Sequence, residues 1–262
     1  MNVESYVVDA ADIEWRHGET EGITFRGQIM LSGDDGGPEA FRFRFDPCLA
    51  VYAHMHMVSQ FQMLLGGTMD LPTRTMRLRP IGVHYTDHAR PYGPFSVGGD
   101  HDVLVLHPRK GGLVTMADRA ARRHIHLSGR ELSGVEDEIA WTEPDPAGIR
   151  MKRLTAEPRP DGPRATLIEL PPGRPLRCGP SPYGRYEVVV RGSAVFGGKR
   201  VGAPGLRFVR GEHAPGDAPG DAHAGPQGAM IAVLEFDADA LEGGLTGDAL
   251  SMTAGEAMAL AL

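Results

Sequence analysis

The chain has 262 residues, enough for one large domain or two domains of about 130 residues each. Glycine (35 residues) and proline (21) together make up about a fifth of the chain, while its hydrophobic content of 41% is that of a globular protein. This combination excludes a disordered chain, disfavours a helical bundle and is typical of an all-β protein with many turns. With 27 basic and 34 acidic residues, the chain lacks the positive excess that nucleic acid or an anionic membrane surface would attract, so we expect neither as a partner.

Signals for export and for membrane insertion are missing from the sequence. The N-terminal residues MNVESYVVDAADIEW contain no basic segment followed by an apolar one, and no apolar run approaches the roughly 20 residues that span a bilayer. Cys48 and Cys178 lie far apart, which predicts packing residues rather than a disulfide scaffold. We therefore expect a cytoplasmic protein.

Short alternating segments bounded by Gly, Pro or Asp predict two sets of β-strands. In chain order these segments are 41–45, 50–57, 60–65, 82–86 and 102–107, then 165–170, 186–190, 194–196, 206–210 and 230–236. The polar, proline-broken region between the sets indicates a connection. The predicted organisation is one unit at 1–125, a connection at 126–150, a second unit at 151–238 and a tail at 239–262. Thr253 and Glu256 have capping-box spacing, which predicts a short helix in that tail, with a frayed terminus as the alternative.

The two sets of strands align when the sequence is shifted by 125 residues. FDP at 45–47 falls on LPP at 170–172, LLGGT at 64–68 falls on VVRGS at 189–193, and GLRF at 205–208, two residues short of the shift, matches GVHY at 82–85. Several landmarks at one shift predict a duplicated β unit.

Histidine is concentrated in one part of the chain, because six of its eleven histidines lie between residues 54 and 107. His54 and His56 are two residues apart in a predicted strand, so their rings share a face and lie close enough to share a metal ion. Gln60 continues that face if the strand runs on without a bulge. The opposite face carries an apolar stripe of Met and Phe between residues 55 and 63. The alternative is a chance pair of strand histidines that only form hydrogen bonds with their neighbours.

The pattern His54-x-His56-x3-Gln60-x6-Gly67, followed by the 82–85 strand and by PYGP at 91–94, resembles the cupin superfamily. The first motif of that family is His-x-His, three or four residues, Glu, six residues and Gly. The resemblance covers residues 40–107, and the repeat extends it to 165–236, so the chain resembles a bicupin. It implies an all-β fold of two tandem antiparallel, jelly-roll-like barrels, the first of which holds a divalent transition metal (iron, manganese, nickel, copper or zinc).

Two positions depart from the family pattern. Gln60 stands where the family has Glu, and Tyr92 stands at the position of the histidine in the second motif. Two imidazoles, an amide oxygen and a phenol would hold a divalent ion less tightly than three imidazoles and a carboxylate. His88, in the preceding turn, could replace Tyr92 if its loop folds inward, and His84 on the adjoining strand could line the pocket.

Elsewhere in the chain the ligand pattern is weaker. The positions of the second unit that are equivalent to His54, His56 and Gln60 predict no metal site, because they hold Gly179, Ser181 and Arg185. A second His-x-His at 124–126 predicts an exposed strand more strongly than a metal site. His213 and His223 flank a Gly/Pro/Asp-rich segment, which predicts an exposed loop.

Three functions agree with this pattern. The first is a metal-dependent enzyme that acts on a small organic molecule by dioxygenase-type chemistry, with isomerase or lyase chemistry as the next expectation. In such an enzyme His54 and His56 would be metal ligands, and Gln60 would be a third ligand or a hydrogen-bond donor to the substrate. Tyr92 would act as an acid, a base or an orienting group. The second is a non-catalytic small-molecule-binding or sensor bicupin without metal, which the missing carboxylate favours. The third is an accessory protein that forms a homodimer or scaffold through the Met/Phe stripe.

Overall fold

The computed structural model describes residues 4–20, 23–46, 50–71, 76–116, 125, 127–145, 148–155, 159, 161–211 and 222–241. The chain forms two compact units: Glu14–Val135 with Ala238–Leu262, called the N-unit here, and Met1–Ile13 with Glu136–Asp237, called the C-unit. The organisation thus differs from the expected one at the N-terminus and in the middle of the chain. The first strand of the chain lies in the C-unit, and the expected connection at 126–150 contains one strand of the N-unit, one strand of the C-unit and the start of another.

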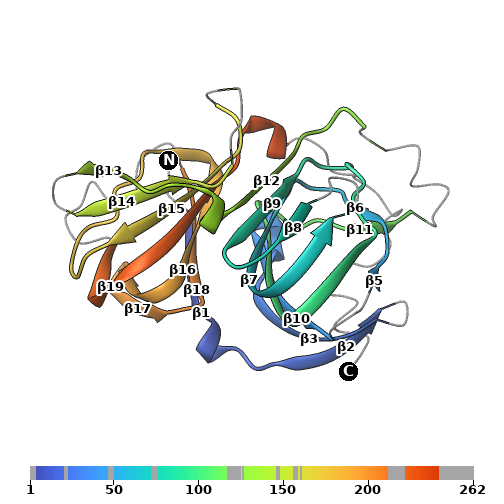
Figure 1. Cartoon of the computed structure of the whole chain (residues 1–262), viewed down its shortest axis with the longest axis horizontal. Coiled ribbons are helices and arrows are strands. Elements are labelled where there is room, and N and C mark those ends of the chain that lie inside the picture. The colour runs from blue at the N-terminus through green and yellow to red at the C-terminus, as the bar shows by residue number, and fades with distance from the viewer. Residues whose placement is uncertain are drawn as a thin grey trace. The chain divides into compact units, whose positions relative to one another are not determined.

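The N-unit consists of antiparallel strands (Figure 1). Its main sheet has the order β12-β9-β7-β10-β4-β3-β2, with β5 paired to β10 and β8 paired to β7, and β6 pairs separately with β11. The bounds are β2 (Arg16–Thr20), β3 (Ile23–Ser32), β4 (Glu39–Phe45), β5 (Ala50–Val51), β6 (His54–His56), β7 (Gln60–Leu71), β8 (Met76–Leu78), β9 (Gly82–Thr86), β10 (Phe95–His107), β11 (Leu113–Thr115) and β12 (Glu131–Val135). Short 3₁₀ helices η2 (Asp34–Gly36) and η6 (Ala238–Leu241) belong to this unit.

The C-unit repeats this arrangement in a sheet of order β1-β18-β16-β19-β15-β14-β13, with β17 paired to β16. Its strands are β1 (Glu4–Asp9), β13 (Thr142–Asp145), β14 (Ile149–Arg153), β15 (Arg164–Leu170), β16 (Ser181–Phe196), β17 (Lys199–Gly202), β18 (Gly205–Gly211) and β19 (Ala222–Glu235). The 3₁₀ helices η1 (Ala10–Asp12) and η5 (Glu136–Glu138) complete its described part. The predicted all-β fold class is therefore confirmed.

The two sheets correspond strand for strand, which agrees with the repeat seen in the sequence. β7 and β16 take the same place, β9 corresponds to β18 and β10 to β19; β1 pairs with β18 as β12 pairs with β9. Gly67 and Gly192 both adopt positive φ, and a Cβ at either would lie 2.4 Å from a backbone oxygen, that of Gly98 or Gly228 respectively. The same close approach in both sheets requires glycine at both positions.

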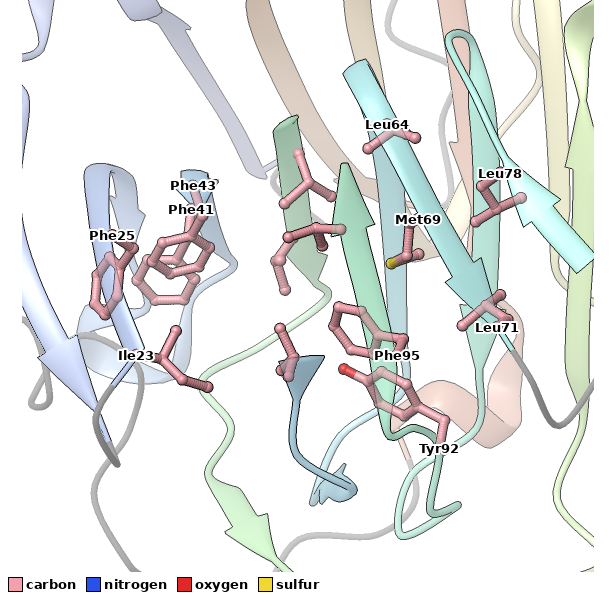
Figure 2. Close-up of a cluster of buried hydrophobic side chains, with 14 of the residues drawn as sticks. Ile23, Phe25, Phe41, Phe43, Leu64, Met69, Leu71, Leu78, Tyr92 and Phe95 are labelled. Atoms are coloured by element: carbon pink, nitrogen blue, oxygen red, sulfur yellow. The ribbon is translucent and has the colours of Figure 1, made fainter. Parts of the chain in front are cut away.

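Alternation of apolar residues builds the core of the N-unit. Phe41 and Phe43 are buried residues of β4, and the ring of Phe25 on β3 meets Phe43 edge-on at 5.3 Å between centroids (Figure 2). Burying a phenylalanine contributes roughly 1.5–3 kcal/mol, so this period-two pattern defines the inner face of the sheet. Tyr92 and Phe95 belong to the same cluster, which brings the region after β9 into the core.

Three local predictions need correction or fall outside the described residues. The single strand expected at 50–57 is divided into β5 and β6 at Tyr52 and Ala53, and β7 begins at Gln60. His223 lies in β19, opposite Val195, rather than in a loop. His213, Cys48, most of the His-x-His at 124–126 and the helix expected near 253–256 lie outside the described residues. Within the described part of the chain, no helix is long and apolar enough to cross a membrane.

Candidate functional site

The predicted site residues of the N-unit come from three elements. β6 carries His54 and His56, β7 begins at Gln60, and Tyr92 lies between β9 and β10. Backbone hydrogen bonds in both directions join Tyr92 to His54, which fixes the tyrosine beside the short strand. All four side chains are at least 95% buried. The structure therefore gathers them inside the unit, although Gln60 does not lie on the same strand as the histidines.

Hydrogen bonds link His54, Tyr92 and Gln62. The Nδ1 of His54 lies 2.8 Å from the Tyr52 carbonyl oxygen, which can only accept, so Nδ1 carries the proton and Nε2 is an acceptor. The Tyr92 hydroxyl, 2.6 Å from Nε2, donates to it and accepts a hydrogen bond from the Gln62 amide at 2.9 Å. The imidazole nitrogen that faces the interior is thus occupied by the phenol.

Burial keeps this group electrically neutral. Desolvation lowers the pKa of His54 to about 4, against a smaller opposing effect of its hydrogen bond to Tyr52. Desolvation, with the neighbouring His107 and His54, lowers the pKa of His56 well below its ordinary value. Desolvation raises the pKa of Tyr92, and its hydrogen bonds with glutamine amides oppose this only partly. At neutral pH both imidazoles are uncharged and the phenol keeps its proton.

Two atoms of the cluster are buried without a hydrogen-bond partner: His56 Nδ1 and Gln62 Oε1. The His56 ring lies 5.3 Å from the ring of His54 and 6.2 Å from that of Tyr92, with which it is stacked. Leaving a buried polar atom unsatisfied costs about 1–3 kcal/mol. These atoms mark the place in the cluster where an additional polar group would be stabilised.

A second polar chain begins at Gln60, and one of its members, Glu39, was not singled out in the sequence. The Gln60 amide donates to Thr86 Oγ1 at 3.2 Å, and its oxygen lies 3.4 Å from His107 Nε2. His107 Nδ1 lies 3.0 Å from Glu39 Oε2, and both side chains are almost fully buried. The clustering of histidines already included His107, but Glu39 precedes the cluster by 15 residues and only the pairing of β10 with β4 brings the two together.

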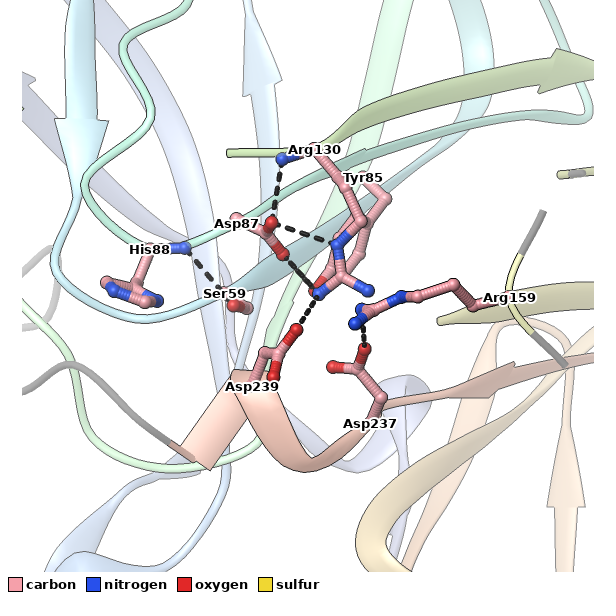
Figure 3. Close-up of polar contacts among 8 residues, drawn as sticks. All are labelled: Ser59, Tyr85, Asp87, His88, Arg130, Arg159, Asp237 and Asp239. Carbon is pink, nitrogen blue, oxygen red and sulfur yellow. Dashed lines mark hydrogen bonds and ion pairs between the residues drawn. The ribbon is translucent and has the colours of Figure 1, made fainter. Parts of the chain in front are cut away.

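The two additional pocket candidates occupy different environments. His84 on β9 is fully buried; its Nδ1 lies 2.8 Å from Ser133 Oγ, and its ring lies 5.6 Å from that of Tyr92. It therefore borders the cluster. His88 lies half-buried in the turn after β9, and the contact described for it joins its backbone N–H to Ser59 Oγ (Figure 3).

A buried ion pair holds the turn that leads to Tyr92. Asp87 accepts hydrogen bonds from the backbone and the guanidinium of Arg130 and from the Tyr85 hydroxyl, and Arg130 also forms an ion pair with Asp239 at 3.2 Å (Figure 3). Burial alone would raise the pKa of Asp87, but the hydrogen bonds and charge of Arg130 outweigh it and hold the pKa below its usual range. Asp87 is therefore ionised, and the pair fixes the start of the turn to Arg130, the residue before β12.

The arrangement does not fit a resident metal ion. His54 Nε2 holds the Tyr92 hydroxyl, and the Gln60 oxygen lies against His107. Among the described residues, no three His, Cys, Asp or Glu side chains gather in a way that could hold a metal ion. A divalent ion would have to displace a buried, protonated phenol and would gain no carboxylate in exchange.

Comparisons with known proteins identify the fold. No protein-family model matches the sequence, and no curated protein sequence matches it. A solved structure from Nostoc punctiforme, provisionally described as a dioxygenase, aligns with TM-score 0.64 at 13% identity, covering 94% of this chain and 87% of its own. Oxalate decarboxylase from Lactobacillus farciminis aligns with TM-score 0.53 at 10% identity, and the alignment covers 90% of this chain and 86% of the decarboxylase chain. The pirin YhhW from Escherichia coli, in complex with nickel(II), aligns with TM-score 0.53 at 7% identity, and the alignment covers 89% of this chain and 99% of the pirin chain.

At these identities the likeness concerns the fold. The neighbours are cupin-superfamily structures, and the alignments extend over both units of this chain. The repeated sheet order and the paired glycines agree with them. The chain thus has the fold of these cupin structures, with two units whose sheets correspond strand for strand.

Proposed function

We propose that the N-unit binds a small, uncharged organic molecule at the cluster of His54, His56, Gln62 and Tyr92, without a resident metal ion. The observation that supports this most directly is the pair of buried atoms without hydrogen-bond partners, His56 Nδ1 and Gln62 Oε1. A ligand hydroxyl donates to the amide oxygen, and the same or a second polar group satisfies the imidazole.

The charge of the cluster supports an uncharged ligand. His54 and His56 are neutral at pH 7, because burial lowers their pKa values, and Tyr92 keeps its proton. An anion or cation would find no counter-charge among these side chains and would lose its hydration. The stacked rings of Tyr92 and Phe95, 6.0 Å apart at 9°, favour an aromatic body on the ligand.

Phenol is the probe that tests this proposal. We expect phenol to raise the unfolding temperature of the full chain, and the rise to persist in excess EDTA. Gln62→Leu removes the acceptor at similar volume and abolishes the effect, whereas Gln227→Leu, at an exposed glutamine of β19, retains it. Stabilisation that disappears on chelation, or that Gln62→Leu leaves unchanged, would overturn the proposal.

The second candidate is a metal-dependent enzyme with dioxygenase-type chemistry, in which His54 and His56 are ligands. Two neutral imidazoles with centroids 5.3 Å apart favour it, because neutral imidazole is the form that binds metals. Elemental analysis of untagged protein distinguishes the two candidates. About one divalent metal per chain in the wild type, lost in the double variant His54→Ala and His56→Ala, would support the enzyme and contradict the metal-free proposal.

A further inference from the structure

The C-unit contains a cavity of about 320 Å³ beside the bulge where β16 pairs with β19. Its lining includes two side chains of opposite charge, Glu169 and Arg191, together with Met230, Pro171 and Pro172. All of the lining residues belong to the C-unit, so the cavity is separate from the polar site of the N-unit. Its volume is at the lower end of the roughly 300–1,000 Å³ of small-molecule sites, which favours a ligand with few heavy atoms.

Strand register places the two charges on either side of a methionine. Met230 on β19 lies opposite Glu169 on β15 and opposite Arg191 on β16. Residues directly opposite one another in antiparallel strands point to the same face of the sheet. Because neighbouring strands lie about 4.8 Å apart, the acidic and basic side chains start from strands about 10 Å apart, with an apolar side chain between them.

The corresponding place in the N-unit has different chemistry. The 125-residue shift places Glu169 on Arg44, and Met230 takes the register position of Asp102. In the N-unit the central Asp102 forms an ion pair with Arg44 at 2.8 Å. Methionine at the central position cannot pair with a charge, so the two copies of the sheet present different chemical groups on this face.

Both charged groups of the cavity can accept a further partner. Arg150 donates through Nε and Nη2 to one oxygen of Glu169, Oε2, whereas Oε1 accepts no hydrogen bond from the described residues. Within the part of the chain that the structure describes, the Arg191 guanidinium forms no ion pair or hydrogen bond. A ligand carboxylate can meet that guanidinium through two parallel hydrogen bonds, and a ligand ammonium can donate to Oε1.

Bare backbone and proline rings form the rest of the wall. A Cβ at Gly192 would lie 2.4 Å from the Gly228 carbonyl oxygen, and a Cβ at Gly228 would lie 2.8 Å from that of Leu170, so no side chain fits at either position. Pro171 and Pro172 have a fixed φ. The shape of the cavity is therefore largely preformed.

We propose that this cavity binds a free α-amino acid with an aliphatic side chain. Its carboxylate lies at Arg191, its ammonium group at Glu169 Oε1, and its side chain on Met230. An acid without an amino group would place its charge near the Glu169 carboxylate, and an amine without a carboxylate would meet the like charge of Arg191. The Glu169 side chain is 32% exposed, so water weakens its ion pairs, and we expect a Kd on the order of 1 mM.

Methionine methyl NMR reports on the cavity directly, because Met230 lies between the two charges. In the full chain, isotopically labelled in its methionine methyl groups, Met230→Leu identifies the Met230 signal. We expect L-leucine to shift this signal to saturation. Isocaproate, which is leucine without its amino group, and isoamylamine, which is leucine without its carboxylate, leave the signal nearly unchanged. Saturable binding of either compound with the affinity of leucine would overturn the zwitterion, and no shift with leucine would refute the site.

Charge variants of the full chain test the two contacts. We expect Arg191→Gln and Glu169→Gln each to weaken L-leucine binding about tenfold or more, because each removes a charge-assisted hydrogen bond. Arg177→Gln removes an exposed arginine elsewhere in the C-unit, and Glu235→Gln removes a glutamate that also pairs with an arginine of a neighbouring strand; both retain wild-type affinity. Unchanged affinity in either cavity variant would overturn the proposal.

Unfolding in solution gives an independent measurement. In a Trp15→Phe background the remaining tryptophan, Trp141, lies in the C-unit and reports its unfolding. L-leucine at a tenfold excess over Kd should raise the folded-to-unfolded ratio about elevenfold, and isocaproate at the same concentration should not. An equal rise with the two compounds would refute recognition of the amino group.

Discussion

Acidification provides a quantitative test of burial in the N-unit, and His101 on β10 is the cleanest place to apply it. His101 is 2% exposed, and both of its ring nitrogens are buried without hydrogen-bond partners. Desolvation lowers its pKa to about 4, although the charge of Asp102 acts in the opposite direction. Replacing this histidine by leucine removes the titrating group without breaking a hydrogen bond.

The sign and size of the effect follow from the two pKa values. The unfolded chain takes up a proton at His101 near pH 6.5, whereas the folded chain does so only near pH 4. Its contribution to stability is therefore present above pH 6.5 and is lost as the pH falls toward 4. One pKa unit is worth about 1.4 kcal/mol, so His101 costs the folded state about 2 kcal/mol between pH 7 and pH 5.

Urea unfolding at pH 7 and at pH 5 measures this loss. In a Trp141→Phe background the remaining tryptophan, Trp15, reports on the N-unit. We expect His101→Leu to lose about 2 kcal/mol less than the parent protein on acidification. His17→Leu, at an exposed histidine of β2, serves as the control. An equal loss in His101→Leu and in the parent would refute the link between burial and stability at this residue.

Two further predictions concern the frame that holds the site. Arg130→Met leaves the buried carboxylate of Asp87 without its charged partner and should cost about 3 kcal/mol or more, whereas Arg77→Gln, which breaks an exposed pair, should not change the urea midpoint measurably. Gly67→Ala should destabilise the N-unit far more than Gly36→Ala in the same assay. Both glycines have positive φ, but a Cβ at position 67 meets backbone atoms at 2.4–2.7 Å, and at position 36 it meets nothing within 4 Å. Equal losses in the two alanine variants would show that φ alone sets the cost.

Much of the architecture could be predicted from the sequence because it depends on local pattern. Period-two alternation and Gly/Pro punctuation located strands such as 82–86, which the structure reproduces as β9 with the same bounds. The repeat was visible because its glycines at 67 and 192 are required by the same close backbone approach in each sheet. The spacing of His54, His56 and Gln60 was sufficient to indicate the cupin fold, which the comparisons confirm.

The chemistry of the site depends on contacts between distant segments, and the sequence does not determine these. The spacing of residues 54–60 suggested one continuous histidine face, but a break before β7 places Gln60 on another strand, next to His107 and Thr86. Tyr92 was expected to act as an acid, base or orienting group; in the folded chain its hydroxyl donates a hydrogen bond to His54 Nε2.

The sequence by itself therefore determined the fold class, the duplication and the half of the chain in which the histidines gather. Only the tertiary structure decided which polar atoms meet and which remain without a hydrogen-bond partner, as Arg185 Nη2 does. The physical reason is that alternation and turn residues act over a few positions along the chain. Hydrogen bonding and the loss of hydration, by contrast, depend on what the rest of the folded chain places around each group.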